Sequence, residues 1–152
     1  MEQNTQWHVR VMDITDYDRV YALWMSCKNM GFNNLDDSRE GIEKYLKRNP
    51  STSFVAEAEQ RIVGVILCGH DGRRGFIHHM AVAEDHRRQG IAAALLKHAL
   101  AALKAEGINK VALVAFTRNE AGNVFWESQG FTAREDLTYR NKALAELIRI
   151  DT

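Results

Sequence analysis

The segment from residue 76 to residue 106 constrains the fold of this chain more than any other. Phe76–Ala83 has the length and apolar content of a strand, in which successive side chains point to opposite faces. Residues 89–106 repeat apolar positions at three- and four-residue spacing, which is typical of an amphipathic helix, and Gly107 suits its left-handed cap. The alternation places Phe76, His78, Met80 and Val82 on one face of the strand and Ile77, His79 and Ala81 on the other.

The remaining elements predict a mixed α/β fold around one twisted sheet. The polar Glu59-Gln60-Arg61 between two β-branched runs predicts a hairpin, and Asn49-Pro50 ends a helix. The expected strands are His8–Met12, Ser53–Glu57, Ile62–Gly69, a central strand at Lys110–Phe116, and one or two strands within Phe131–Arg140. The expected helices are those around Thr15–Trp24, Asp36–Arg48 and Asn119–Gln129. Lys142–Ile150 fits either a strand or a short helix.

Composition predicts a single-domain protein without a built-in charge preference. The 152 residues suit one domain spanning 1–152, and 20 basic residues balance 20 acidic ones. We therefore expect no nucleic-acid partner and no attraction to a membrane surface. No apolar stretch reaches the roughly 20 residues that cross a bilayer, and the first residues lack a secretory signal. These features, with two widely separated cysteines, predict a cytoplasmic protein.

The turn between the strand and the long helix has the composition of an anion-binding site. Arg87 and Arg88 supply positive charge, while Gly90, Ala92 and Ala93 keep bulky side chains away from the helix start. The first amides of a helix have no partner within it, and the helix dipole adds positive charge at the same end. We therefore predict a phosphate or pyrophosphate site here. The alternative is an ordinary helix start with solvated arginines.

Two segments resemble the GNAT superfamily of acetyltransferases. Met80–Ala92 resembles its central acetyl-CoA-binding motif, with Arg87-x-x-Gly90-x-Ala92 matching the phosphate loop. Asn119–Phe131 is similar to a later motif, in which an asparagine opens a helix that ends in an aromatic residue, a polar pair and Gly-Phe. The resemblance is nearest to bacterial RimI-like and YpeA-like acetyltransferases. It implies the GNAT fold, a mixed and mainly antiparallel twisted sheet of six to seven strands flanked by helices.

The same resemblance implies the cosubstrate and its binding residues. The cosubstrate is acetyl-CoA, whose acetyl group passes to a primary amine by direct attack in a ternary complex. The acceptor is a small amine or a protein N-terminal amine. Amides of the turn hold the pyrophosphate, and the strand backbone pairs with the pantetheine arm where two strands splay apart. The cofactor-binding residues expected on this basis are Met80, Ala81, Val82, Arg87, Arg88, Gln89, Gly90, Ile91, Ala92, Ala93, Asn119, Asn123 and Trp126.

Three side chains are candidates for proton transfer: His78, Glu57 and Tyr139. Acetyl transfer needs a neutral amine, a stabilised oxyanion and a proton for the departing thiolate. His78 is the first candidate base, because it shares a strand face with Met80; Glu57 is the second. Many GNAT enzymes carry a thiolate-protonating tyrosine where this chain has Trp126, so the proton would come from another tyrosine, such as Tyr139, or from water. The structural alternatives are a packed histidine, a solvated glutamate and an edge-strand aromatic residue.

The sequence gives less support to thiol or metal chemistry. Cys27 and Cys68 lack an activating partner and are interpreted as packing residues. The six histidines lack metal-ligand spacing, since His78 and His79 are expected on opposite strand faces, and we predict no metal.

The acceptor is expected to contact Trp24–Asp37, between the first two helices. The rival function is a CoA-binding regulatory or scaffold protein with little turnover, for which Trp126 is the main argument. The oligomeric state stays open between monomer and homodimer.

Overall fold

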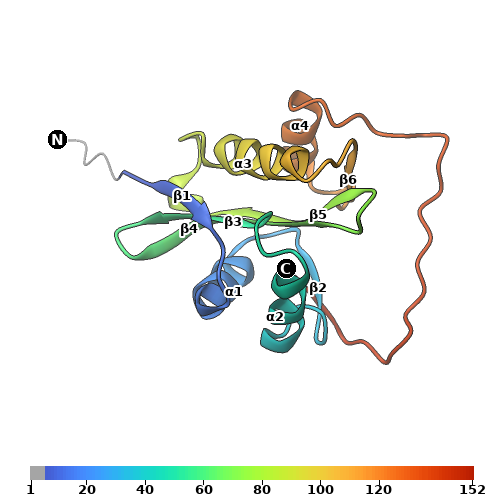
Figure 1. Ribbon diagram of the computed structural model, residues 1–152, viewed down its shortest axis with the longest axis horizontal. Coiled ribbons are helices and arrows are strands. Elements are labelled where there is room, and N and C mark those ends of the chain that lie inside the picture. The colour runs from blue at the N-terminus through green and yellow to red at the C-terminus, as the bar shows by residue number, and fades with distance from the viewer. Residues whose placement is uncertain (1–5) are drawn as a thin grey trace.

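Five strands form one sheet with helices on both faces (Figure 1). The computed structural model describes residues 6–152. The strand order is β1-β3-β4-β5-β6, and neighbouring strands are antiparallel except for the parallel pair of β5 and β6. The strands are β1 (His8–Val11), β3 (Phe54–Ala58), β4 (Arg61–His70), β5 (Gly75–Val82) and β6 (Val111–Leu113). The predicted mixed α/β class with a mainly antiparallel sheet is therefore confirmed.

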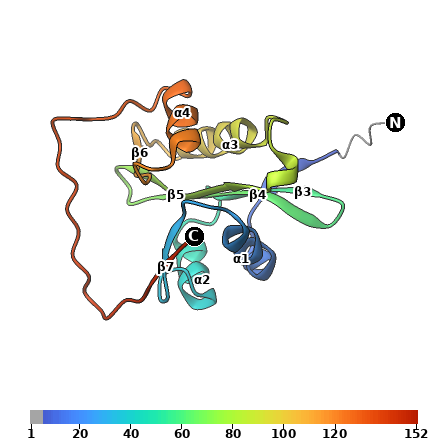
Figure 2. The ribbon, with the colours of Figure 1, turned by 180° about the vertical axis from the view of Figure 1, so that it is seen from behind.

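The helices cover both faces of the sheet, as Figures 1 and 2 show from opposite sides. Helices α1 and α2 cover one face, while α3 covers the other and has α4 on its side of the sheet. The helices are α1 (Tyr17–Ser26), α2 (Arg39–Arg48), α3 (Ile91–Ala105) and α4 (Glu120–Ser128), and two 3-10 turns are η1 (Ile14–Asp16) and η2 (Glu84–His86). All the predicted helices are present, with ends displaced by a few residues.

Helix α3 packs very closely on the sheet. Its apolar row is buried as predicted, with Ile91 and Leu95 at 1% and 0% exposure. Gly64 of β4 permits this approach, because a Cβ at that position would lie 2.7 Å from Cγ2 of Ile91 and 3.0 Å from Cδ1 of Leu95. Both residues belong to the first turns of α3, so the close contact fixes where the helix begins relative to the sheet.

The alternation predicted for β5 is wrong at the centre of the strand. Leu67 of β4 pairs with His79, but the next residue, Cys68, pairs with Ile77. Strand β5 therefore carries one extra residue, His78, opposite a single step of β4. Such a bulge interrupts the regular pleat and changes which side chains share a face.

The bulge places both histidines on the face covered by α1 and α2. The ring of His78 packs against Tyr45 of α2, with 5.4 Å between centroids. The ring of His79 packs against Trp24 of α1, with 5.0 Å between centroids. Val82 lies on the opposite face, because its partner in β4 faces α3. The adjacent histidines thus lie on the same face of the sheet, whereas strict alternation of side chains along the strand predicted opposite faces.

The segment expected to supply the last strands lies outside the sheet. No strand occurs within Phe131–Arg140; instead, β7 (Arg149–Asp151) pairs antiparallel with β2 (Gly31–Asn33) in a separate two-stranded sheet. A strand needs a hydrogen-bonding neighbour, and within this segment Arg134 instead binds Asp136 two residues away, at 2.8 Å.

The strand expected at Lys110–Phe116 is also shorter than predicted and differently placed. Only Val111–Leu113 is a strand, and it forms the edge of the five-stranded sheet instead of its centre. Its central position depended on further strands from the C-terminal segment, which do not join this sheet.

Candidate active site

The turn that leads into α3 leaves the helix N-terminus open. Gly90 occupies the N-cap position with a left-handed φ of 81°, and no side chain caps the helix there. Arg88, with φ 63°, is also left-handed. A glycine cap without a side-chain acceptor leaves the first amides of α3 available to an anion, and the helix dipole favours negative charge at the same place. Arg87 and Arg88 are both exposed beside it.

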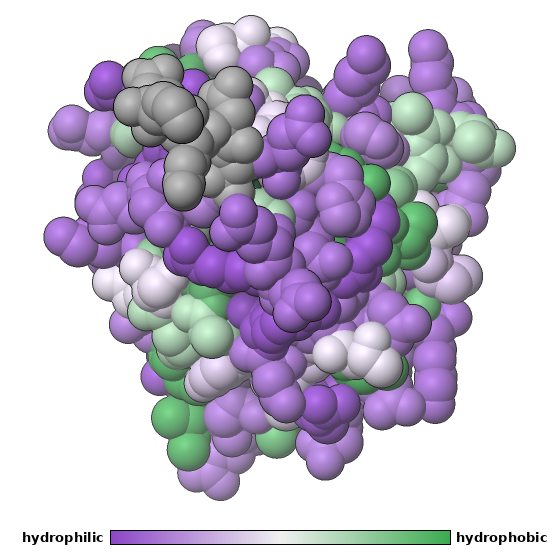
Figure 3. All heavy atoms as spheres, turned by 90° about the vertical axis from the view of Figure 1, so that its left-hand side faces the viewer, coloured by the Kyte–Doolittle hydropathy of each residue, from purple (hydrophilic) through white to green (hydrophobic). Residues whose placement is uncertain are grey.

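Asp85, one of the two acidic residues of this turn, is paired with basic neighbours. The carboxylate of Asp85 accepts a hydrogen bond from Arg61 at 2.7 Å and lies 2.9 Å from Nδ1 of His86. These two partners, Arg61 first, lower the pKa of Asp85 to about 2. Figure 3 views the end of the molecule that carries this turn, where the surface is mostly hydrophilic. The turn can therefore receive an anion without strong repulsion from Asp85.

Strand β5 has an unpaired edge that ends at this turn. It pairs with β6 only from Gly75 to Ile77, whereas it pairs with β4 as far as Val82. Within residues 6–152, residues 78–82 therefore have no strand on the β6 side, which is the splayed arrangement that the resemblance implied. An extended ligand can add to such an edge through main-chain hydrogen bonds. The edge of β5 and the open start of α3 are joined by the turn of residues 83–90, so main-chain groups of both are available near one end of the strand.

A buried histidine–carboxylate pair lies beside this edge. Nε2 of His79 is 2.7 Å from Oδ1 of Asp37, and the two side chains are only 11% and 9% exposed. Asp37 is fixed in place, because its second oxygen accepts from the Asn33 amide at 2.8 Å and its carbonyl accepts from the Tyr17 hydroxyl at 2.7 Å. Sequence reasoning included Asp37 only as the end of the acceptor region, because nothing local signals a partner 42 residues away.

Aromatic rings hold both histidines in position. His79 packs on Phe32 of β2, with 4.5 Å between centroids, as well as on Trp24. His78 contacts Phe76 at 4.8 Å and keeps part of its ring exposed. Burial, with a smaller effect from the neighbouring His79, lowers the pKa of His78, although the carboxylates of Asp37 and Asp36 oppose the shift. The lowered pKa favours the neutral imidazole, which is the form that accepts a proton.

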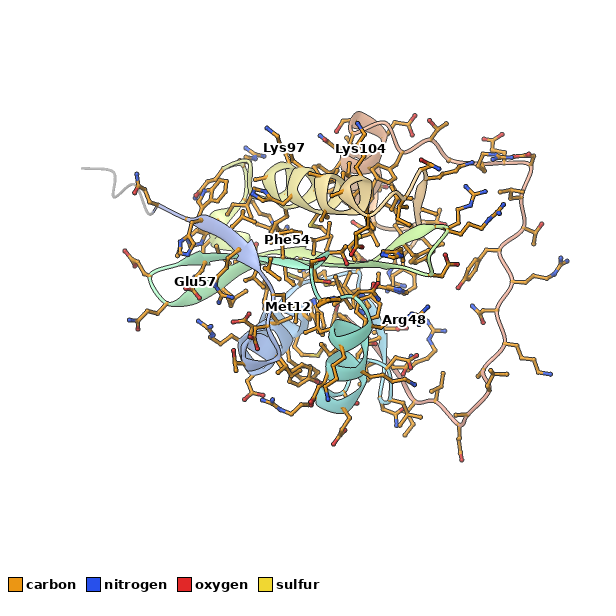
Figure 4. All side chains as sticks on the ribbon, viewed as in Figure 1. Met12, Arg48, Phe54, Glu57, Lys97 and Lys104 are labelled. Carbon is orange, nitrogen blue, oxygen red and sulfur yellow. The ribbon has the colours of Figure 1, made fainter. Side chains whose placement is uncertain are left out.

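Glu57, the second candidate base, is engaged elsewhere. Its carboxylate accepts hydrogen bonds from Arg10 at 2.9 Å and Arg19 at 3.2 Å. The Arg10 hydrogen bond is the main cause that lowers the pKa of Glu57. Figure 4 shows Glu57 at the end of β3 near α1, and β4 separates β3 from β5. The structure therefore places Glu57 in an ion-pair cluster and not beside the two histidines.

Comparison with known proteins identifies the family. The profile of the Acetyltransferase (GNAT) family matches residues 17–131. The chain belongs to the GNAT acetyltransferase family. The acetyltransferase SG1711 of Sodalis glossinidius is 30% identical over 138 residues, which cover 91% of this chain and 96% of the relative.

Solved structures show that the GNAT fold extends over most of the chain. The aminoglycoside acetyltransferase AAC(6')-Iy, in complex with a CoA-linked bisubstrate analogue, superposes with a TM-score of 0.71 at 17% identity, covering 91% of this chain and 99% of that one. A ribosomal-protein-alanine N-acetyltransferase from Brucella melitensis biovar Abortus 2308 has a TM-score of 0.66 at 20% identity, with the same coverage. At these identities the likeness concerns the fold.

The later GNAT motif of this chain forms α4 and its cap. Oδ1 of Asn119 accepts a hydrogen bond from the Gly122 amide at 3.0 Å, and Nδ2 of Asn123 donates to the Phe116 carbonyl at 3.0 Å. Trp126 is buried, with 8% exposure. Asn119 and Asn123 thus use part of their hydrogen-bonding capacity within α4 and the loop that follows β6. A cosubstrate could contact only their remaining donors and acceptors.

Tyr139, the tyrosine considered as a proton donor, is not gathered with these residues. It is 65% exposed and lies in the irregular segment that follows α4. No contact joins Tyr139 to the turn before α3 or to β5 within residues 6–152, so the structure does not bring this tyrosine to the candidate site.

Metal and thiol chemistry find little support in this GNAT chain. Within residues 6–152, no three side chains of histidine, cysteine, aspartate or glutamate gather as a metal-binding group. Cys27 and Cys68 are both buried and unpaired by disulfides. Burial raises the pKa of Cys68 to about 12, so its thiol stays protonated. None of the helices described here has the length and apolar content to span a membrane.

Proposed function

We propose that this chain transfers the acetyl group of acetyl-CoA to a primary amine, either a small amine or a protein N-terminal amine. The observation that carries the proposal is the unpaired edge of β5 that ends at the open N-terminus of α3. In this proposal the amides that follow Gly90 hold the pyrophosphate with help from Arg87 and Arg88. The main chain of residues 80–82 pairs with the pantetheine arm. The membership of the GNAT family supports both assignments.

Proton removal from the amine is assigned to the two histidines of β5, with His79 as the main base. A neutral His79 that donates a hydrogen bond from Nε2–H to Asp37 keeps its lone pair on Nδ1. A carboxylate that orients a histidine in this way is a recurrent arrangement for general bases. His78, expected from the sequence as the first candidate, is the alternative base on the same face.

The need for a base depends on the acceptor. An amine of the lysine type, with a pKa of about 10.4, costs about 4.6 kcal/mol to deprotonate at pH 7, whereas an α-amine of about 7.8 costs about 1.1 kcal/mol. His79→Gln should therefore reduce kcat/KM about 100-fold for a lysine-type amine and less for an α-amine. His78→Gln is the matched control. If His78→Gln causes the larger loss, the role of main base passes to His78.

The function itself is tested by thiol release from acetyl-CoA with a panel of amines and N-terminal peptides. Gly90→Glu should abolish acetyl-CoA binding, since the carboxylate would occupy the anion site. Gly107→Glu is the matched control, because Gly107 has a similar φ of 79° and open space around it, but lies at the opposite end of α3. Equal loss in both variants would mean that backbone strain, and not the anion site, is responsible.

A CoA-binding protein with little turnover is the second candidate. It is favoured by Trp126, which occupies the place of the usual tyrosine and cannot donate a titratable proton. Binding of CoA that Gly90→Glu removes, without thiol release for any amine, would favour this second function. Trp126→Tyr should then increase release.

A further inference from the structure

The segment that follows β6 carries an aromatic side chain, Phe116, at the gap between β5 and β6. The two strands run parallel, and their last paired residues are Ile77 and Leu113. Within residues 6–152, the segment 114–119 has no strand pairing, while β5 continues beside β4. Phe116 is the one aromatic residue of this segment, and it is half-buried. It is therefore the large side chain on the far side of the gap from β5.

Phe116 links the two faces of the sheet. Its carbonyl accepts hydrogen bonds from the Asn119 amide and from Nδ2 of Asn123, both at 3.0 Å, so its main chain is held by the start of α4. Its ring reaches β2, because a Cβ at Gly31 would lie 2.9 Å from Cζ of the ring. Helix α4 lies on the α3 side of the sheet, whereas β2 lies on the side of α1 and α2 (Figures 1 and 2). Phe116 thus passes from one face to the other where β6 leaves β5.

The ring of Phe116 lies next to the aromatic group around His79. Gly31, which the ring touches, directly precedes Phe32 in β2. The ring of Phe32 packs on that of His79, with 4.5 Å between centroids. His79 from β5 and Phe116 from the segment after β6 therefore flank the same gap, and β2 joins them on the face that carries the candidate bases.

Arg118 holds the ring from its other side. The carbon Cζ of the guanidinium lies 4.3 Å from the centroid of the Phe116 ring, which is the geometry of a cation–π contact. Nε of Arg118 also donates a hydrogen bond to Oδ1 of Asn29 at 3.1 Å, which ties the segment to the acceptor region. A ring enclosed between Gly31 and Arg118 has little freedom to move aside, so it acts as a firm wall of the gap.

We propose that Phe116 limits the length of the acyl group that this chain accepts from an acyl-CoA donor, and so makes it selective for acetyl. The inference rests on the proposed function, in which the pantetheine arm pairs with residues 80–82. The thioester that follows would then lie toward residues 78 and 79, and its acyl group would enter the gap to reach an amine beside the histidines. An acetyl group ends in one methyl, whereas a butyryl group extends two carbons further and would meet the ring.

Steady-state kinetics with acetyl-, propionyl- and butyryl-CoA test the proposal. Each added methylene changes discrimination by roughly 10–200-fold in a fitted pocket, so the wild type should prefer acetyl-CoA to butyryl-CoA at least about 100-fold in kcat/KM. Phe116→Ala should reduce this preference at least about tenfold. Phe116→Leu should reduce it less, and it keeps an apolar side chain against Gly31 if the alanine variant does not fold. Arg118→Ala is the matched control, because it removes the bond to Asn29 but keeps the ring, and it should preserve most of the preference.

Calorimetric binding of the same donors without an amine separates this inference from the proposed function. The ratio of the dissociation constants of butyryl-CoA and acetyl-CoA should fall at least about tenfold in Phe116→Ala. A chain that shows this fall but transfers no acyl group to any amine would lose the proposed transferase function and keep the acyl-length role of Phe116. Equal binding of both donors by the wild type, a ratio that neither Phe116 variant changes, or an equal change in Arg118→Ala would overturn the proposal.

Discussion

Replacement of Asp16 by alanine should destabilise the fold by about 2–3 kcal/mol. Asp16 is only 1% exposed, and its carboxylate accepts two hydrogen bonds from Arg10, at 2.7 and 2.9 Å, one from Arg19 at 3.0 Å and one from the Asp13 amide at 2.9 Å. Breaking a buried ion pair costs about 3–5 kcal/mol. The cost here is lower, because both arginine side chains are partly exposed and keep their contacts with Glu57.

The effect should depend on pH in a defined direction. Burial raises the pKa of Asp16, but the hydrogen bonds and charges of Arg10, Arg19 and the Asp13 amide outweigh it, so the pKa lies below its ordinary value. A carboxyl with a depressed pKa stabilises the fold above its unfolded pKa of about 3.9, and that contribution is lost as the pH falls through the folded pKa. The difference between wild type and variant should therefore be full at pH 7 and shrink below about pH 4.

Urea unfolding followed by circular dichroism at pH 7 and at pH 3 measures this difference. Asp18→Ala is the matched control, since Asp18 is 83% exposed in a 3.4 Å ion pair with Arg39 and should change stability by less than about 0.5 kcal/mol. A loss for Asp16→Ala no larger than the control, or one that is independent of pH, would refute the argument that a buried ion-pair cluster stabilises the junction of β1, β3 and α1.

Three further outcomes follow from the packing and titration of particular groups. Gly64→Ala should cost about 1–3 kcal/mol in urea unfolding, because the added methyl would crowd Ile91 at the start of α3; an unchanged midpoint would mean that the helix can shift. In an NMR titration, His78 should have a pKa below the ordinary value of about 6.5, and Asp37→Asn should lower it further, because that carboxylate raises it. Cys68 should resist alkylation at pH 8 until the protein unfolds, since its pKa is raised to about 12.

The sequence by itself determined the family and the local geometry of the turn before α3. The strand, the basic turn and the start of α3 are contiguous, so residues 80–93 specify their own local geometry, and Gly90 adopts the left-handed conformation that suits an open helix start. The apolar row of α3 was equally evident, because a helix buries residues at a fixed local period. Both predictions rest on interactions between residues close in the chain.

Only the tertiary structure decided which side chains gather at the candidate site. The bulge at His78 arises from how β5 pairs with β4, and it moves His78 and His79 to one face against the regular alternation. The pairing of His79 with Asp37 depends on β2 and α2 folding against β5, which no local pattern encodes. The fate of Phe131–Arg140 has the same cause: strand propensity is local, but a strand forms only where another chain segment offers its hydrogen bonds.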